Sequence, residues 1–278
     1  MSSVARARRR ALWTLGIVAL LAAATSVLAQ PRVAGHRGGA LVWPENSLLG
    51  FRQAIAAGVE FLETDVHPTA DGELVILHDP TLDRTTTGRG AVRDLRLADL
   101  GALRLRAADG SVTDEPIPTL AQVLDLVHPS RAELLLEIKV GPDRRRYPGI
   151  EEQVLAAVRS RGLSARTVVM SFQRETVSRI RELDPAIRTA LLVARIQIDG
   201  AGVPATDAVK WAKAVGATAL GLQHTAVDAA VVAAARQAGI ILGAWTVNDE
   251  AEIRRVAELG VDIVISDRPD LAKRLLGR

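Results

Sequence analysis

The sequence contains no cysteine and few aromatic residues, and both absences limit what the chain can be. Cysteine is missing from all 278 positions, and aromatic residues make up 3% of them. Without cysteine the chain can form no disulfide framework and offers no cysteine for lipidation. Because aromatic side chains are scarce, alanine, valine, leucine and isoleucine must build the core. The chain has 278 residues, of which 48% are hydrophobic. This is enough for one large domain with a full core.

The first 29 residues differ from the rest and predict an export signal. Four arginines come first, an uncharged apolar run follows to about Ala24, and small residues precede Gln30. This order is typical of a signal peptide that is cleaved on export. We therefore expect a periplasmic or extracellular protein. The alternative is a membrane anchor, because residues 11–29 carry no charge and approach the ~20 residues of a membrane span.

The net charge does not favour a nucleic-acid partner. The whole chain carries a formal charge of +3, but residues 1–29 hold four arginines and no acidic residue, so the charge falls to −1 without them. A basic surface of the kind that binds nucleic acid is therefore not indicated. Membrane contact is expected only through the N-terminal segment, and only if that segment stays attached.

Residues 60–79 carry the strongest chemical signal in the chain. Phe61 to Val66 predicts a strand that turns Glu63 and Asp65 to one face. Two adjacent carboxylates repel each other, and burying them unpaired is costly. A hard cation such as Mg²⁺ or Ca²⁺ would relieve both effects, because such ions prefer oxygen ligands. On this stretch alone, a solvated acidic strand edge remains the alternative.

A second strand follows the acidic one directly. Asp71-Gly72 predicts a turn, and Glu73 to Leu77 predicts a strand that returns antiparallel to the first. This return places His78 and Asp79 either towards the start of the first strand or across its neighbour, and the sequence leaves both open.

A glycine-rich turn earlier in the chain carries a histidine and an arginine. Residues 32–36 predict a short strand that leads into Gly35-His36-Arg37-Gly38-Gly39, whose glycines allow the backbone to approach a ligand. Arg37 could pair with a phosphate through its forked guanidinium, or it could be an ordinary surface arginine. Asn46 or Ser47 then caps a predicted helix.

From Pro118 onward, helices and strands alternate regularly. We predict helices over 120–127, 151–161, 175–183, 207–215, 228–238 and 249–259, and strands over 133–140, 167–172, 187–193, 219–222, 240–246 and 262–266. This alternation predicts a parallel sheet. Together with the strands at Val33 and Phe61 there are eight, which predicts an α/β fold of the (β/α)8 TIM-barrel type over residues 30–278. Residues 80–118 break the rhythm and predict a small insertion after the second strand. That insertion could shape substrate access or be a passive surface loop.

Active residues of such barrels lie at the carboxyl ends of the strands, and the polar candidates of this chain fall there. Glu137 and Lys139 are two residues apart on one strand and therefore share a face. Alone they would be read as a structural ion pair. The convergence of other groups on the same rim argues against that reading; these groups are His36, Arg37, Glu63, Asp65, Ser171, Phe172, Trp245, Ser266 and Asp267.

The motifs along this rim resemble those of the glycerophosphodiester phosphodiesterase family. The matching segments, in order, are His36-Arg37-Gly38, Pro44-Glu45-Asn46, Glu63-Thr64-Asp65-Val66, Asp71-Gly72, His78-Asp79, Leu136-Glu137-Ile138-Lys139, Trp245-Thr246-Val247-Asn248 and Ser266-Asp267-Arg268-Pro269. Each motif is weak alone, but their order along nearly the whole exported chain is specific. Ser47 and Ser266 stand where the family commonly has threonine, and both keep the hydroxyl.

The resemblance implies hydrolysis of glycerophosphodiesters, small-molecule substrates, to an alcohol and glycerol 3-phosphate with a divalent cation, Mg²⁺ or Ca²⁺. It also implies roles for particular residues of the rim. The acid/base pair would be His36 and His78, the metal ligands Glu63, Asp65 and Glu137, the substrate contacts Arg37, Lys139 and Trp245, and the further candidates Glu45 and Phe172. The family varies around Gln223-His224, so the resemblance does not fix the alcohol.

Two other functions stay open at this point. A lysophospholipase D or sphingomyelinase D-like phosphodiesterase would use a similar barrel and metal site, and an apolar groove near the insertion and residues 194–205 would favour it. An inactive barrel that binds phosphate-bearing ligands is the other, although none of the expected histidines and carboxylates is missing. Of the remaining histidines, His67 precedes Pro68 and could touch the site, His128 is expected to end a helix, and His224 could contact the rim.

Overall fold

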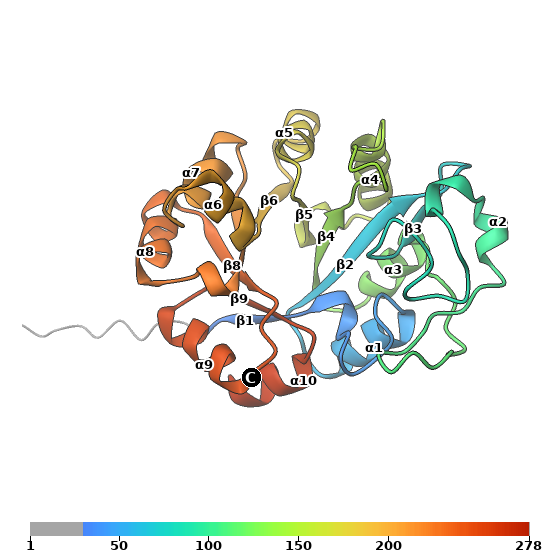
Figure 1. Cartoon of the computed structure of the whole chain (residues 1–278), viewed down its shortest axis with the longest axis horizontal. Coiled ribbons are helices and arrows are strands. Elements are labelled where there is room, and N and C mark those ends of the chain that lie inside the picture. Colours follow the sequence, from blue (N-terminus) through green and yellow to red (C-terminus); the bar gives the residue numbers. More distant parts are fainter. Residues whose placement is uncertain (1–29, 278) are drawn as a thin grey trace, which may run out of the picture.

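The computed structural model describes residues 30–277, and a closed parallel barrel forms its centre (Figure 1). The barrel strands are β1 (Arg32–Gly35), β2 (Phe61–Pro68), β4 (Glu133–Ile138), β5 (Thr167–Ser171), β6 (Arg188–Val193), β7 (Ala219–Gln223), β8 (Ile241–Trp245) and β9 (Ile263–Ser266). Their spatial order is β1-β9-β8-β7-β6-β5-β4-β2, and a parallel pairing of β1 with β2 closes the ring. The predicted eight-stranded barrel is confirmed. The expected export signal or anchor over residues 1–29 lies outside the described residues.

Helices surround the barrel and connect its strands (Figure 1). They are α1 (Leu48–Ala56), α3 (Leu120–Val127), α4 (Ile150–Ser160), α5 (Arg174–Leu183), α6 (Arg195–Ala201), α7 (Asp207–Ala214), α8 (Ala229–Ala238), α9 (Glu250–Leu259) and α10 (Pro269–Leu275). The predicted helices agree with these to within one or two residues, and His128 is the C-cap of α3 as expected. The sequence did not predict α6 or α10. Among residues 30–277, no helix combines the length and the apolar character that crossing a membrane requires.

The side chains on the two faces of each barrel strand pack into different layers of the core, as those of β4 illustrate. Leu134 and Leu136 belong to the large apolar layer between the sheet and the helices. Leu135 instead packs inside the barrel with Phe61 and other apolar side chains. Because side chains alternate along a strand, Glu137 follows Leu135 on the inner face. The same alternation places Glu63 and Asp65 of β2 inside the barrel, two and four residues after Phe61.

The insertion builds on β3 (Leu74–Ile76), which pairs antiparallel with β2. Leu77 N donates a hydrogen bond of 3.1 Å to Asp65 O. The chain therefore runs back along β2 as far as Asp65, and His78 lies beside that position. Residues 80–118 contain α2 (Leu97–Leu100), shorter than the helical piece expected over 95–103. Apolar side chains of residues 80–118 form a separate small cluster with two residues of the β3 segment; its members are Val75, Leu77, Leu82, Val92, Leu100, Leu105 and Ile117. This local core gives the insertion a defined shape beside one side of the barrel.

Candidate active site

A cavity of about 90 Å³ opens at the carboxyl ends of the barrel strands. Its polar wall consists of His36, Arg37, Glu63, His78 and Glu137, which come from β1, β2, β3 and β4 or the turns after them. The opposite wall is largely apolar and consists of Met170, Phe172, Leu192, Trp245, Thr246 and Ile265. The structure therefore brings predicted residues from several different strand ends to one place.

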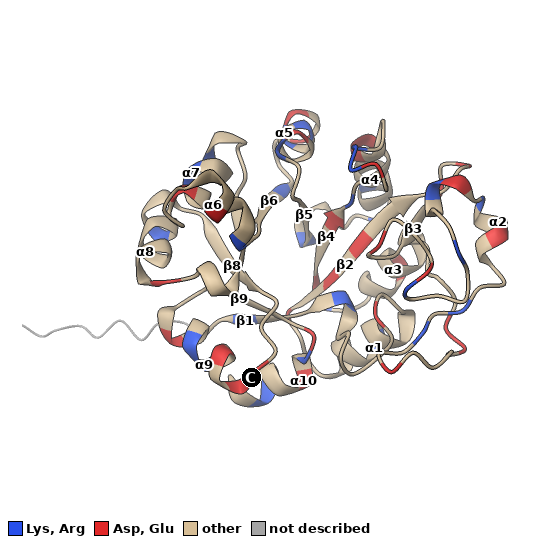
Figure 2. Ribbon diagram, in the orientation of Figure 1, with Lys and Arg blue, Asp and Glu red and all other residues tan. Residues whose placement is uncertain are grey.

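Three carboxylates converge at the base of the polar wall. Glu63 and Asp65 lie two residues apart on β2, and the parallel register sets Asp65 directly opposite Glu137 of β4. One oxygen of each carboxylate lies within 4.8 Å of the others, and the three residues are 2%, 1% and 7% exposed. Figure 2 shows these acidic positions on β2 and β4 within a barrel of mostly uncharged residues. The alternative of a solvated acidic strand edge is wrong, because all three groups are buried.

The charges around these carboxylates are only partly balanced. Burial and repulsion from Asp65 raise the pKa of Glu63 to about 8. Burial also raises the pKa of Glu137, although Lys139 acts against it. For Asp65, burial works to raise the pKa, but Lys139, His78 and Arg37 hold it far below its usual value. The nearby positive groups thus offset the burial and mutual repulsion of Asp65 but not those of Glu63 and Glu137.

The donor set fits a hard divalent cation. All three groups offer carboxylate oxygen, which Mg²⁺ and Ca²⁺ prefer. Asp65 Oδ1 is buried and forms no hydrogen bond with the described residues, although Lys139 Nζ lies 3.3 Å away. A cation between the carboxylates would satisfy this oxygen and reduce the repulsion that raises the pKa of Glu63. Glu63, Asp65 and Glu137 are therefore the residues that could hold a metal ion.

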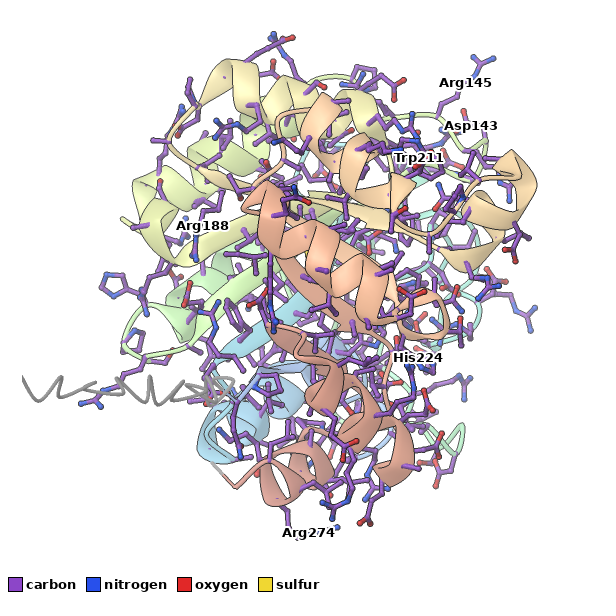
Figure 3. The ribbon with its side chains drawn as sticks, turned by 90° about the vertical axis from the view of Figure 1, so that its left-hand side faces the viewer. Asp143, Arg145, Arg188, Trp211, His224 and Arg274 are labelled. Carbon is purple, nitrogen blue, oxygen red and sulfur yellow. The ribbon has the colours of Figure 1, made fainter. Side chains whose placement is uncertain are left out.

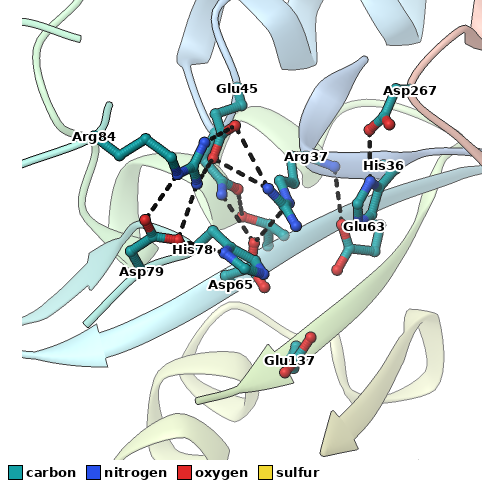
Figure 4. A network of polar contacts seen from close by, with 12 residues as sticks. His36, Arg37, Glu45, Glu63, Asp65, His78, Asp79, Arg84, Glu137 and Asp267 are labelled. Carbon is teal, nitrogen blue, oxygen red and sulfur yellow. Dashed lines mark hydrogen bonds and ion pairs between the residues drawn. The ribbon is translucent and has the colours of Figure 1, made fainter. Parts of the chain in front are cut away.

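The two predicted histidines share one arrangement (Figure 4). His36 Nδ1 lies 2.6 Å from Asp267 Oδ1, and His78 Nδ1 lies 2.7 Å from Asp79 Oδ1. Because an ionised carboxylate only accepts hydrogen bonds, each Nδ1 carries a proton and each Nε2 is available to a ligand. For His36, burial acts to lower the pKa, but Glu63, whose Oε2 lies 3.8 Å from Nε2, and Asp267 raise it overall.

Arg37 joins the cavity to a chain of ion pairs. Its backbone N donates to Glu63 Oε2 at 2.8 Å, and its guanidinium lies 3.7 Å from Asp65 Oδ2 and 3.3 Å from Glu45 Oε1. Glu45 in turn accepts two hydrogen bonds of 2.9 Å from Arg84. The predicted candidate Glu45 thus lies beside Arg37, with both of its oxygens bound to arginines.

Two other predicted site residues lie in the apolar wall. Phe172 directly follows β5 and Trp245 ends β8, and both side chains line the cavity. Their rings pack edge to face, with centroids 5.5 Å apart and planes at 89°. Such a pair is rigid and offers an apolar surface to the carbon atoms of a ligand.

Sequence reasoning missed several residues that orient the site. Asn46 was a candidate helix cap, but Ser47 caps α1, and Asn46 Nδ2 donates to Asp65 Oδ2 at 2.9 Å instead. Asp267, which holds His36, is itself held by Asn248 at 2.8 Å. The motifs containing these residues were visible in the sequence, but nothing local in them identifies a partner so far along the chain.

The other histidines lie outside the cavity. His67 is fully buried behind His78, with Nδ1 2.9 Å from Tyr147 Oη and Nε2 3.2 Å from His78 O. Burial lowers its pKa to about 4, so the ring is neutral and helps to fix the backbone of His78. His224, labelled in Figure 3, pairs with Glu252 of α9 at 2.8 Å and lines neither the cavity nor the groove beside it.

The charge imbalance predicts how stability depends on pH without divalent cations. The folded form keeps a proton on Glu63 up to about pH 8, whereas the unfolded form loses it near the ordinary value of 4.5. The free energy of unfolding should therefore fall as the pH rises between these two values. Glu63→Gln removes this titration, so its stability should fall less over that range. Urea unfolding of both proteins in chelator tests this, and an equal pH dependence would contradict it.

The comparisons with known proteins agree with this site. Residues 36–271 match the model of the glycerophosphoryl diester phosphodiesterase family. The chain is 32% identical over 251 residues to a glycerophosphodiester phosphodiesterase of Bacillus subtilis (strain 168), covering 85% of this chain and 83% of that protein. A crystal structure from Agrobacterium tumefaciens str. C58 has a TM-score of 0.82 and 30% identity, with 89% and 98% covered.

A second solved structure carries a product. It is a phosphodiesterase of Oleispira antarctica in complex with sn-glycerol-3-phosphate, with a TM-score of 0.73, 26% identity, and 90% of this chain and 98% of that chain covered. The family match covers most of the chain, and the relative from Bacillus subtilis is covered over most of its own length. The chain belongs to the glycerophosphoryl diester phosphodiesterase family and is a phosphoric diester hydrolase.

Proposed function

We propose that this enzyme hydrolyses glycerophosphodiesters to an alcohol and glycerol 3-phosphate with one divalent cation, Mg²⁺ or Ca²⁺, held by Glu63, Asp65 and Glu137. The observation that carries this proposal is the convergence of three buried carboxylates between two histidines. When bound, the cation would act as a Lewis acid on the phosphoryl oxygens. Either ion suits the oxygen ligands, and metal titration will distinguish them.

His36 and His78 are the proposed acid/base pair. Each ring is fixed by a carboxylate at Nδ1, which orients the ring and leaves Nε2 for the substrate. One histidine takes the proton of the attacking hydroxyl, and the other gives a proton to the departing alcohol oxygen. The attacking hydroxyl belongs either to the glycerol of the substrate, through a cyclic phosphate that water then opens, or to water itself.

Arg37 and Lys139 are the proposed phosphate contacts. A phosphodiester carries one negative charge, and more negative charge gathers on its oxygens in the transition state. For Lys139, burial works to lower the pKa, but Glu137 and Asp65 hold it above its usual value, so the ammonium remains charged. Trp245 and Phe172 face these groups and would pack against the carbon atoms of the glycerol.

The cavity and the groove beside it differ from the open apolar groove expected for a lysophospholipid substrate. The apolar surface of the cavity comes from barrel strands, and a volume of about 90 Å³ is too small for an acyl chain. The larger groove beside the insertion is lined mainly by polar and small residues. An apolar groove was the expected mark of a lysophospholipase D, whereas Leu41 is the one large apolar residue among those that line the groove beside the insertion.

We further propose that the enzyme is exported and acts in the periplasm or outside the cell. The N-terminal arginines, the apolar run and the small residues before Gln30 support this location. Attachment to the membrane through residues 11–29 is the alternative.

Removal of divalent cations should abolish hydrolysis of glycerophosphocholine. The reason is that the three carboxylates repel the anionic substrate when no cation lies between them. Release of choline should be measured after exhaustive chelation and after separate addition of Mg²⁺ and Ca²⁺. Unchanged hydrolysis in chelator would show that the metal assignment is wrong.

His36→Ala and His78→Ala should each lower turnover by roughly two to four orders of magnitude, the usual range for acid–base groups. Both side chains lie at the cavity and not in the apolar layers, so the melting temperature should change little. Turnover and thermal unfolding should be measured on the same preparations. Near-normal turnover in either variant would remove that histidine from the mechanism, and a large loss of stability would favour a structural role.

The mature protein should begin at Gln30. N-terminal sequencing of protein recovered outside the cytoplasm tests this expectation. An intact arginine-rich N-terminus in a membrane fraction would instead favour the anchor.

A further inference from the structure

A groove of about 450 Å³ lies beside the catalytic cavity and shares His36, Arg37 and Thr246 with it. Its far side belongs to the insertion and consists of Arg84, Thr85, Arg106, Ala107, Ala108 and Gly110. A substrate whose phosphate lies at the carboxylates can therefore extend from the small cavity into the groove. Since the glycerol phosphate is the compact part that all substrates of this class share, the variable alcohol is the part that would occupy the larger space.

Among the charged residues that line this groove, Arg106 is the one that forms no ion pair with a carboxylate of the described residues. Its Nε donates to Thr86 O at 2.9 Å and one terminal nitrogen to Gly110 O at 3.0 Å. These carbonyls hold the guanidinium in place without neutralising it, whereas Arg37 and Arg84 both bind Glu45. The remaining donors of Arg106 are available to a ligand.

Thr85 adds an unsatisfied hydroxyl next to Arg106. The residue lines the groove and is 5% exposed, yet its Oγ1 has no hydrogen-bond partner among residues 30–277. Its carbonyl accepts a hydrogen bond of 2.8 Å from Arg106 N, so the two residues are fixed side by side. Buried hydroxyls are normally hydrogen-bonded, and an unpaired one at a ligand groove indicates a partner that the chain itself does not supply.

The remaining lining argues against a cationic alcohol. The two carboxylates of the groove are already engaged, Glu45 by two arginines and Asp267 by His36 and Asn248. No aromatic residue of the described chain lines the groove, and quaternary ammonium groups are bound by aromatic faces. The charged guanidinium of Arg106, with the buried unpaired hydroxyl of Thr85 beside it, instead matches an anionic oxygen group.

We propose that this groove is the subsite of the leaving alcohol, and that Arg106 and Thr85 select alcohols that carry a carboxylate. The inference rests on the proposed function, because it assigns a substrate class to the same site. Glycerophosphoserine and glycerophosphoethanolamine test it directly, since the two diesters differ by a single carboxylate. The wild-type enzyme should have the higher kcat/KM for glycerophosphoserine.

Arg106→Gln should lower the ratio of kcat/KM for glycerophosphoserine to that for glycerophosphoethanolamine by about tenfold, the effect of losing one charge-assisted hydrogen bond. Arg106→Lys keeps the charge and should retain part of this preference. Thr85→Val removes only the unpaired hydroxyl, so it should lower the ratio severalfold without lowering the melting temperature. An unchanged ratio in both Arg106→Gln and Thr85→Val would overturn the proposal.

Arg104→Gln is the matched control. Arg104 lies two residues before Arg106 in the insertion and also donates to backbone carbonyls, those of Gly101 and Leu103, but it does not line the groove. Its removal should leave the ratio unchanged. A fall in the ratio as large as that of Arg106→Gln would show a general effect of charge and would overturn the assignment to the groove.

A binding measurement separates this inference from the proposed function. If the wild-type enzyme hydrolyses neither of these diesters nor glycerophosphocholine, the proposed function fails. The groove is then judged by calorimetric binding of both diesters to His78→Ala in the presence of Mg²⁺. Tighter binding of glycerophosphoserine supports the subsite, and equal dissociation constants overturn it. If Arg106→Gln does not fold, the ratio in Thr85→Val decides.

Discussion

Three like charges buried within a few ångströms of one another are the constraint on which this structure depends. Glu63, Asp65 and Glu137 could not remain ionised together in an apolar barrel without compensation. The chain supplies that compensation from three directions: Lys139 from the end of β4, Arg37 from the turn after β1, and Asn46 from the segment before α1. This compensation of the negative charge is incomplete, because the pKa of Glu63 remains raised. The unbalanced charge is what equips the site for a cation.

The barrel makes such a cluster possible because its register leaves little freedom. Parallel pairing sets Asp65 opposite Glu137, and strand alternation turns both inward. A shift of one residue in either strand would turn the carboxylates into the apolar layer beneath the helices. The apolar layers on both sides of the sheet therefore fix the geometry of the charges, although they contact no substrate.

Features that arise from periodicity could be predicted from the sequence, whereas those that depend on distant contacts could not. Eight strands were visible because each apolar run is followed by a helix of regular period. Helix α6 was missed because Ile198 is its only buried residue, which leaves no apolar period to detect. The site carboxylates could be predicted, since strand ends define the rim. Asn46 could not, because its position before a helix favours a cap, and the contact with Asp65 exists only in the folded chain.

The pairing of His36 with Asp267 likewise could not be predicted from local sequence, because 231 positions separate the two residues. Neither the local rules nor the resemblance paired these two residues, because both identify positions along the chain and not the contacts between them. The residues proposed for the chemistry lie on the barrel strands or in the turns after them, except His78, which follows β3. Arg106 and Thr85 belong to the insertion, whose separate apolar cluster allows its surface to change without disturbing the register of β2 and β4. The proposed acid/base and metal residues thus come from the barrel strands, the turns after them and the end of β3, whereas the proposed alcohol contacts come from the insertion.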